Sequence, residues 1–230
     1  MTEQLALGVT LRDEAIFDNF YVSEANQEVV THLRSTLDGE QPFLFLWGAP
    51  STGKTHLLQA CCHAWPGKGR APCYLPLDDA SLVPDVLDGL EKLPLVCLDN
   101  IEYVMGDPAW EEALFHFYNR AQEAGTVLIV ASRFPPRQLP CGLADLQSRL
   151  TSGLTNALSP LSDEEKVTVL TVRANYLGLS VSSDVALFLI RRYSQDLAHL
   201  CELIVYLDKA ALSTKRKLTV RLVKEVLAFD

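Results

Sequence analysis

Short apolar runs alternate with amphipathic segments up to about residue 158. The apolar runs are continuous, as in strands buried on both faces of a parallel sheet, and lie at 43–47, 72–77, 93–99, 126–131 and 154–158. The segments between them carry apolar residues at helical spacing, over 24–38, 54–65, 84–90, 109–124 and 143–150. Alternating strands and helices predict an α/β fold, a parallel sheet in a three-layer αβα sandwich.

A different pattern follows Pro160, where only helical periodicity remains. Four helices are predicted, at 162–177, 182–193, 195–213 and 219–228, with Ser162 as a cap and Gly178 as a stop. An all-helical stretch after an α/β pattern indicates a separate small subdomain. We therefore expect three parts: an N-terminal tail (1–12), a nucleotide-binding subdomain (13–159) and a helical subdomain (160–230).

The strand at 43–47 leads directly into a phosphate-binding motif. Residues Gly48, Ala49, Pro50, Ser51, Thr52, Gly53, Lys54 and Thr55 match G-x-x-x-x-G-K-[ST], the P-loop, and a helix follows. Its glycines let backbone N–H groups approach phosphate oxygens, and the helix N-terminus adds a positive dipole. Lys54 is expected to reach the β/γ-phosphates, and the Thr55 hydroxyl to ligate Mg²⁺.

Residues on either side of the P-loop complete the expected nucleotide contacts. Phe20 and Tyr21 close an aromatic segment that we expect to lie over the nucleotide. His56 follows the motif directly and is included among the candidate contacts. Packing or exposure is nevertheless favoured over ligand binding for both His56 and His63.

A second group of candidate residues lies at the ends of two later strands. Asp99 ends the run at 95–98, where a neighbouring strand would carry a Mg²⁺-organising aspartate. Hydrolytic members of this class carry a second acid next, but here it is Asn100, whose amide can orient water without taking its proton. The next acid, Glu102, lies two residues beyond Asn100 and need not point toward the nucleotide. Ser132 could contact the γ-phosphate or the attacking water. We therefore predict weak or no intrinsic hydrolysis.

Composition narrows the class of protein. A net charge of −9 argues against broad affinity for DNA, so DNA contact is expected to be weak or indirect. The six cysteines, at 61, 62, 73, 97, 141 and 201, have no C-x-x-C spacing and are interpreted as reduced core residues. No apolar run is long enough to span a bilayer and no signal peptide is evident, which is typical of a cytoplasmic protein.

The polar N-terminus contains an isolated apolar pattern in Gln4, Leu5 and Leu7. In an extended chain the two leucines point to one side and could fill a pocket on a partner. The pattern Gln-Leu-x-Leu resembles the motif by which bacterial replication proteins bind the sliding clamp. The alternative is that these leucines dock on the core of their own chain.

Several of these motifs together resemble the AAA+ module of the bacterial initiator DnaA. They are the P-loop, Leu-Val-Cys-Leu-Asp-Asn (95–100), Ile-Val-Ala-Ser-Arg-Phe-Pro-Pro (129–136), Leu-Gln-Ser-Arg-Leu (146–150) and Phe-Asp-Asn-Phe (17–20) with Asn26. A clamp motif before such a module, with no DnaA-type DNA-binding domain after it, resembles the Hda family of DnaA-related regulators. The helical subdomain would then be an AAA+ lid.

The resemblance implies roles for particular residues. Arg149 would be an arginine finger, supplied in trans to the ATP of DnaA while the chain docks on the β sliding clamp of DNA polymerase III. The lid position that usually supplies a second arginine to the phosphates is Ala198, which suits ADP or another nucleoside diphosphate with Mg²⁺ as the working ligand. Arg191 and Arg192 are secondary candidates for phosphate contact.

Two competing functions stay open at this point. One is an ATPase of the DnaA or clamp-loader type, against which Asn100 and Ala198 count; the other is a scaffold that affects no ATPase. Self-association as a homodimer or a head-to-tail oligomer is compatible with an AAA+ module. The basic run 215–217 is interpreted as a solvated loop between helices, with DNA contact as the alternative.

Overall fold

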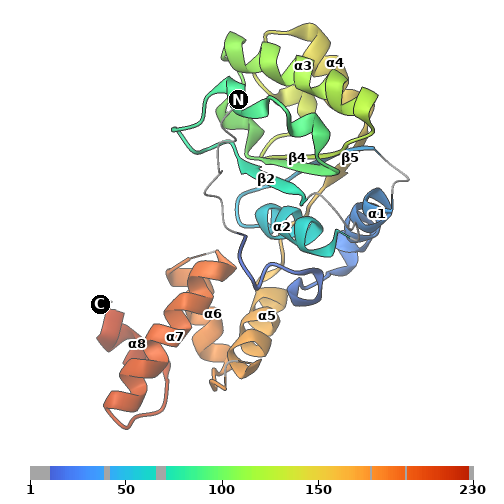
Figure 1. Ribbon diagram of the computed structural model, residues 1–230. Helices are drawn as coiled ribbons and strands as arrows, with labels where there is room; N and C mark the ends of the chain where they lie inside the picture. Colours follow the sequence, from blue (N-terminus) through green and yellow to red (C-terminus); the bar gives the residue numbers. More distant parts are fainter. Residues whose placement is uncertain (1–10, 39–41, 66–70, 177, 195, 228–230) are drawn as a thin grey trace. The chain divides into compact units, whose positions relative to one another are not determined.

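The computed structural model of the chain describes residues 11–38, 42–65, 71–176, 178–194 and 196–227. The chain divides into two compact units, one up to Ser159 and one from Pro160 (Figure 1). The first, the sheet unit, contains every strand of the described residues. The second, the helical unit, contains four helices. Each unit has its own core and is described separately.

Five parallel strands form one sheet in the order β2-β3-β4-β1-β5. They span Cys73–Pro76 (β2), Leu95–Asp99 (β3), Val127–Ser132 (β4), Phe43–Trp47 (β1) and Leu154–Ala157 (β5). The first strand of the chain, β1, is an internal strand, with β4 on one side and β5 at the sheet edge on the other. The carboxyl ends of β1, β3 and β4 therefore meet at one edge, where ligands bind in open α/β sheets.

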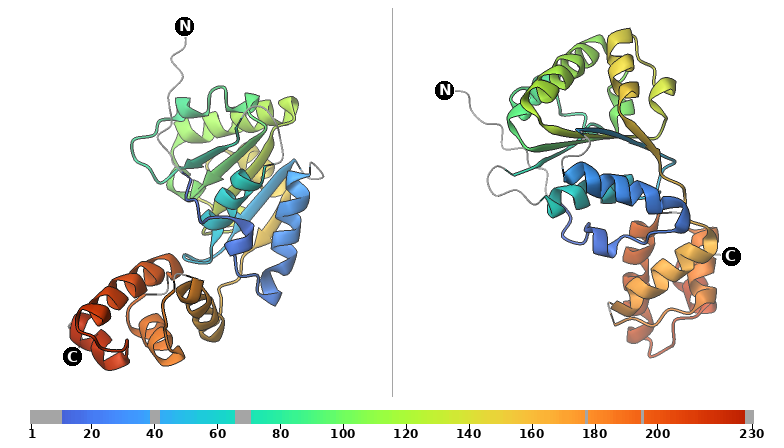
Figure 2. Two further views of the ribbon diagram at one scale, coloured as in Figure 1. Left: turned by 60° about the horizontal axis from the view of Figure 1, so that its bottom comes forward. Right: turned by 90° about the vertical axis from the view of Figure 1, so that its right-hand side faces the viewer.

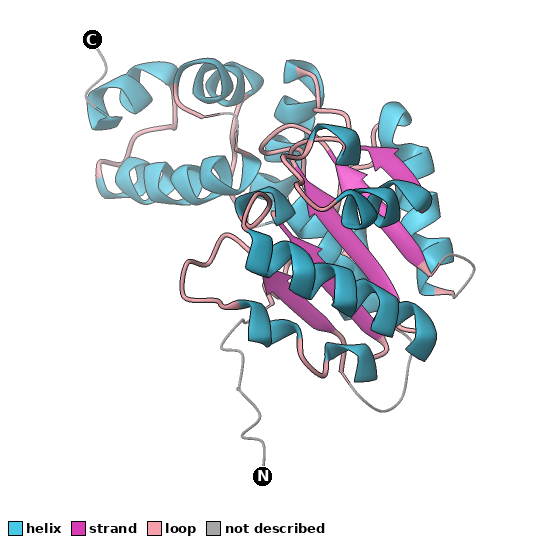
Figure 3. Cartoon of the chain, turned by 90° about the horizontal axis from the view of Figure 1, so that it is seen from above, coloured by secondary structure: helices cyan, strands magenta, loops and turns pink. Residues whose placement is uncertain are grey.

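Helices cover both faces of the sheet (Figures 2 and 3). One face carries α1 (Gln27–Leu37) and α2 (Lys54–Ala64). The other carries α3 (Pro108–Ala124) and α4 (Ala144–Ser152). Alternate residues of the central strands enter the two cores, so that Phe45 packs on the α3 side and Leu44 on the α2 side. The predicted three-layer αβα sandwich is confirmed.

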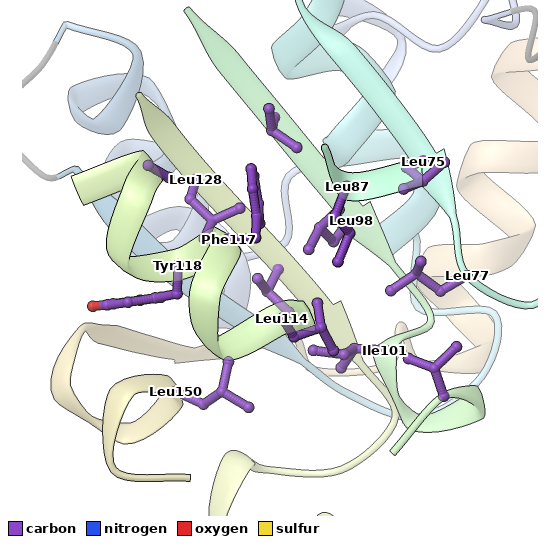
Figure 4. Packing of buried hydrophobic residues seen from close by; sticks show 14 of the residues in the cluster. Leu75, Leu77, Leu87, Leu98, Ile101, Leu114, Phe117, Tyr118, Leu128 and Leu150 are labelled. Carbon is purple, nitrogen blue, oxygen red and sulfur yellow. The ribbon is translucent and has the colours of Figure 1, made fainter. Parts of the chain in front are cut away.

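The core on the α3 side fixes the position of α4 (Figure 4). Leu114, Phe117 and Tyr118 of α3 are buried together with Leu146 and Leu150 of α4. These residues repeat at three- and four-residue spacing, which gives each helix one apolar stripe toward the sheet. The outward positions of α4 are polar, and Arg149 is exposed there.

The helical unit consists of α5 (Asp163–Tyr176), α6 (Ser183–Arg192), α7 (Leu197–Ser213) and α8 (Val220–Leu227). Its own core gathers buried aliphatic side chains from all four helices, among them Leu170, Leu189, Leu207 and Val223. Arg191 pairs with Asp163 at 3.1 Å, joining α6 to the start of α5. Within the described residues, no helix has the length and apolar character needed to cross a membrane.

The local structure differs from the sequence prediction in a few places. The segment 84–90 is two short 3-10 turns, Pro84–Leu87 (η3) and Leu90–Lys92 (η4), because Gly89 between them has a positive φ. Ser23 does not cap an α-helix: it precedes a 3-10 turn, Glu24–Asn26 (η2), without a side-chain capping bond. The predicted stop at Gly178 is confirmed, since it adopts positive φ, and Gly125 ends α3 in the same way.

Candidate nucleotide-binding site

The P-loop joins β1 to α2 at the carboxyl edge of the sheet. Gly48 leaves the strand with its N–H bonded to Ser132 O at 3.1 Å, and a Cβ here would lie 2.5 Å from Leu158 O. Gly53 has φ +100°, and a Cβ there would lie 2.7 Å from the Phe20 ring. Both positions therefore require glycine, the first because of a backbone contact and the second because of its conformation as well.

Lys54 is buried at the first turn of α2. Its ammonium donates to Gly48 O at 2.7 Å and Ala49 O at 2.9 Å, both carbonyls of the loop. Burial lowers the pKa of Lys54 below its ordinary value of 10.5, while the carboxylates of Asp99 and Glu102 oppose that shift. A cation held by the carbonyls of a glycine loop can neutralise phosphate oxygens placed there.

Thr55 and Asp99 are in contact, although the prediction that Asp99 lies on the strand next to the P-loop strand is wrong, because β4 lies between β1 and β3. Thr55 Oγ1 donates to Asp99 Oδ2 at 2.6 Å. Asp99 is fully buried and also accepts from the Tyr74 hydroxyl at 2.8 Å and from its neighbour's backbone, Asn100 N, at 3.0 Å. Burial raises the pKa of Asp99, although these hydrogen bonds and Lys54 oppose the shift.

The donor set at this point suits a magnesium ion. A hydroxyl and a carboxylate oxygen, both turned toward the P-loop, are ligands that Mg²⁺ accepts when nucleotide phosphates supply others. Thr55 and Asp99 would hold the ion, which would neutralise charge on the phosphates. Tyr74 was not predicted from the sequence, because nothing in strand β2 signals that its hydroxyl meets the carboxylate at the end of β3.

The chain turns sharply after Asp99. Asn100 adopts the left-handed conformation, with φ 58° and ψ 41°, and a 3-10 turn, Ile101–Tyr103 (η5), follows. The side chain of Glu102 is 8% exposed and lies 3.3 Å from Arg133 Nε. It interacts electrostatically with Lys54. The turn thus brings the second acid, which the sequence left unplaced, to the Lys54 side of the sheet edge.

Ser132 is the last residue of β4 rather than a residue past the strand. It is fully buried, and its Oγ accepts the Phe134 N–H at 3.0 Å, so it shapes the turn that follows the strand. The next residue, Arg133, is exposed and donates to the Tyr103 hydroxyl at 2.8 Å. Contact of Ser132 with a phosphate or a water remains a prediction.

The segment before α1 lies along α2. Phe20 covers Gly53, and its ring centroid is 5.6 Å from that of His56. His56 Nε2 is 2.9 Å from Ile16 O, and His63 Nε2 is 3.0 Å from Arg12 O. The two histidines thus hold the chain that leads to the N-terminal tail. Tyr21 is 38% exposed, and its expected contact with nucleotide remains a prediction.

The cysteines are free thiols. Four of them, Cys61, Cys62, Cys73 and Cys97, are buried, and Cys141 and Cys201 are half-buried. Burial raises the pKa of Cys73 to about 11, which keeps that thiol protonated and unreactive at neutral pH. Their interpretation as reduced residues packed in the interior fits this placement.

Comparison with known proteins agrees with the architecture. Residues 163–227 match the family model described as "Hda, lid domain". The helical unit is similar to the lid domain of the Hda family. Domain III of the replication initiation protein DnaA from Thermotoga maritima superposes with a TM-score of 0.81 at 21% identity, covering 96% of this chain and 98% of that one.

Two further structures have the same fold. AMPPCP-bound DnaA from Aquifex aeolicus gives a TM-score of 0.71 at 22% identity, over 84% of this chain and 66% of that chain. The Holliday-junction branch migration motor RuvB from Thermotoga maritima gives 0.65 at 19% identity, over 89% and 70%. The chain therefore has the fold of these proteins, and its helical unit is similar to an Hda lid domain.

Other predicted site residues are placed as follows. Arg149 is exposed in the last turn of α4. Arg191 is engaged with Asp163 inside the helical unit, and Arg216 of the basic run pairs with Glu225 at 2.6 Å. Gln4, Leu5 and Leu7 lie outside the described residues, as does the side chain of Ala198.

Proposed function

We propose that this chain is a DnaA-related regulator of replication initiation that activates the ATPase of DnaA. It binds a nucleoside diphosphate, with magnesium, at the P-loop. It docks on the β sliding clamp through Gln4, Leu5 and Leu7, and supplies Arg149 in trans to the ATP held by DnaA. Hydrolysis converts DnaA to its ADP form and prevents re-initiation.

The position of Arg149 in the sheet unit is the observation that carries the proposal. In a parallel sheet the P-loop follows the carboxyl end of β1, and α4 returns the chain to the amino end of β5. Arg149 lies just before β5, whose first residue, Leu154, pairs with Leu44 near the amino end of β1. The topology therefore separates Arg149 from Lys54 of its own chain, and its exposed guanidinium is available to a neighbouring molecule.

The C-terminal end of α4 is also packed firmly enough to hold the Arg149 side chain in a defined position. Leu146 and Leu150 are buried on either side of Arg149. Ser152 Oγ donates to Arg149 O at 2.8 Å and lies 3.3 Å from the Tyr118 hydroxyl of α3. A finger acts by neutralising charge that develops on the transferred phosphoryl group, and it is effective only when positioned in advance.

Nucleotide bound at the P-loop has a regulatory role in this proposal. The loop, Lys54, Thr55 and Asp99 would hold the phosphates and the magnesium ion, and the position after Asp99 is an amide. Nucleotide bound there would brace α2 and the segment 12–20 that lies on it. That segment continues in sequence into the tail, and the proposal links nucleotide binding to presentation of the clamp motif through this connection.

A reconstituted reaction tests the proposal. DnaA loaded with ATP would be mixed with clamp loaded on DNA, and phosphate release measured with and without this chain. The proposal expects release to accelerate only when the chain, the clamp and a diphosphate are all present. The K54A variant, which loses the phosphate cradle, is expected to lose the stimulation. Equal phosphate release with and without the chain would contradict it.

A further inference from the structure

Glu102 is a buried carboxylate with unused hydrogen-bonding capacity. Its side chain is 8% exposed, and neither carboxylate oxygen has a hydrogen-bond donor within the described part of the chain. Arg133 Nε lies 3.3 Å from Oε1, close enough for an ion pair. Buried carboxylates in native proteins normally accept several hydrogen bonds.

The backbone places this carboxylate at the nucleotide site. Asn100 is left-handed, which costs free energy for a residue other than glycine. The 3-10 turn that follows is closed by Tyr103 N bonded to Asn100 O at 3.1 Å. As a result, the acid at position 102, not position 100, lies beside Arg133, which follows β4, and it is near enough to Lys54 of the P-loop to interact with it electrostatically.

The cost of burying the Glu102 carboxylate indicates that it receives a hydrogen bond from a donor outside the described part of the chain. Burying an acidic side chain without hydrogen bonds is strongly unfavourable relative to leaving it in solvent. A single ion pair whose arginine is 43% exposed offsets little of that cost. Strained backbone and an unsatisfied acid in one turn are typical of functional sites. The smallest donor that satisfies such an oxygen beside a phosphate is a water molecule.

We propose that Glu102 is the water-activating residue of this site, and that the chain slowly hydrolyses a nucleoside triphosphate bound at its own P-loop. The water oxygen bonds to the γ-phosphorus while the bond from that phosphorus to the β–γ bridging oxygen breaks. The water proton passes to Glu102, and the electron pair of the broken bond leaves with the β-phosphate. The products are a nucleoside diphosphate and inorganic phosphate.

Arg133 is a positioning residue in this scheme. It contacts the Glu102 carboxylate on one side and the Tyr103 hydroxyl on the other, which holds the acid in its turn. The inference deepens the proposed function, because it gives the chain a means of producing its diphosphate-bound form. It rests on nucleotide binding at the P-loop and is independent of Arg149.

Single-turnover hydrolysis by the isolated chain tests the inference. Protein in excess over ATP and Mg²⁺ is incubated, and conversion of the bound nucleotide to ADP is followed over time. The E102Q variant is expected to slow conversion by about 10² or more, the range for loss of a general base. The matched control is E112Q, since the Glu112 side chain is 75% exposed on α3.

Two measurements that do not depend on catalytic activity, analogue binding and urea unfolding, accompany the hydrolysis assay. E102Q is expected to bind a non-hydrolysable triphosphate analogue within about threefold of the unchanged chain, because a general base contributes mainly after binding. Its urea-unfolding midpoint is expected to be at least that of the unchanged chain. Bound ATP that never converts, equal rates in E102Q, or loss of analogue binding or folding in E102Q would each overturn the inference. None of these experiments contains DnaA or clamp, so their failure is distinct from failure of the proposed function.

Discussion

The Glu111 carboxylate of α3 accepts the backbone N–H of Leu143, the residue before α4, at 2.8 Å. It also accepts from Gly142 N at 3.0 Å and Gly106 N at 2.8 Å. The side chain of Leu143 cannot cap α4, so an acid from another helix satisfies the donors at its start. The helix that bears Arg149 is thus tied to α3 at its beginning by Glu111 and at its end through Tyr118 and Ser152.

Loss of the Glu111 carboxylate is expected to destabilise the sheet unit. E111A leaves the N–H groups of Gly142 and Leu143 unpaired, and we expect the free energy of unfolding to fall by about 3 kcal/mol. Urea unfolding measures it. E112A, at the adjacent exposed position, is the control and should stay within about 0.5 kcal/mol. A change in E111A as small as in the control would show that α4 needs no cap from α3.

The same residue predicts a pH dependence. Burial alone would raise the pKa of Glu111, but the N–H donors of Gly142, Gly106 and Leu143 outweigh it and hold the pKa below the ordinary value of 4.5. A carboxylate with a depressed folded-state pKa stabilises the protein above its unfolded-state pKa and loses that contribution as the pH falls through the folded value. The stability difference between the unchanged chain and E111Q should therefore be constant above about pH 5 and shrink as the pH falls below 4.5. A difference independent of pH down to acid unfolding would contradict this.

Tyr74 is expected to tune magnesium-dependent nucleotide binding. Its hydroxyl donates to the Asp99 oxygen that also accepts from Thr55. Y74F therefore removes one of the hydrogen bonds that fix the orientation of the Asp99 carboxylate. We expect the affinity for nucleotide with Mg²⁺ to weaken by roughly 10-fold, the lower end for outer-shell partners of metal ligands. Titration in EDTA provides the contrast, since metal-free binding should change little. Equal weakening with and without magnesium would assign Tyr74 to packing alone.

The N-terminal motif predicts a selective loss of clamp binding. The double variant Q4A/L5A removes the polar and apolar contacts proposed for the clamp pocket while leaving the P-loop unchanged. We expect recovery of the clamp in a pull-down to fall at least 10-fold, with nucleotide affinity unaltered. T2A/E3A, in the same tail, is the control. Equal recovery by both variants would return Leu5 and Leu7 to the alternative of docking on their own chain.

The P-loop half of the site could be predicted because its motif is local. The order strand, glycine loop and helix fixes Gly48, Gly53, Lys54 and Thr55 within one short segment, and the carboxyl ends of parallel strands must meet. For that second reason Asp99 could be assigned to the same side of the sheet as Thr55, although the two are 44 residues apart. The order of the strands was not predicted correctly, because sequence does not show that β4 inserts between β1 and β3.

Other contacts form only when distant segments meet in the folded protein, and no local sequence pattern predicts them. In the sequence Tyr74 looks like any other strand residue, because its hydrogen bond to Asp99 depends on the pairing of β2 with β3. Glu111 looks like one of two surface acids in Glu111-Glu112 until the loop before α4 folds over the first. Glu102 depends on the left-handed backbone of Asn100, and an asparagine in sequence does not reveal its conformation. The 3-10 turns at η3 and η4 were missed for a similar reason, since Gly89 splits what looks like one short helix.

The most direct measurement for the central claim is phosphate release from ATP-loaded DnaA with clamp on DNA, comparing the unchanged chain with R149A. R149A is expected to lower the stimulation by about 10³ or more, the scale of arginine fingers supplied in trans, with clamp binding and nucleotide affinity retained. R137A, at an exposed arginine in the 3-10 turn Pro136–Gln138 (η6), should remain active. Stimulation by R149A equal to that of the unchanged chain would contradict the account.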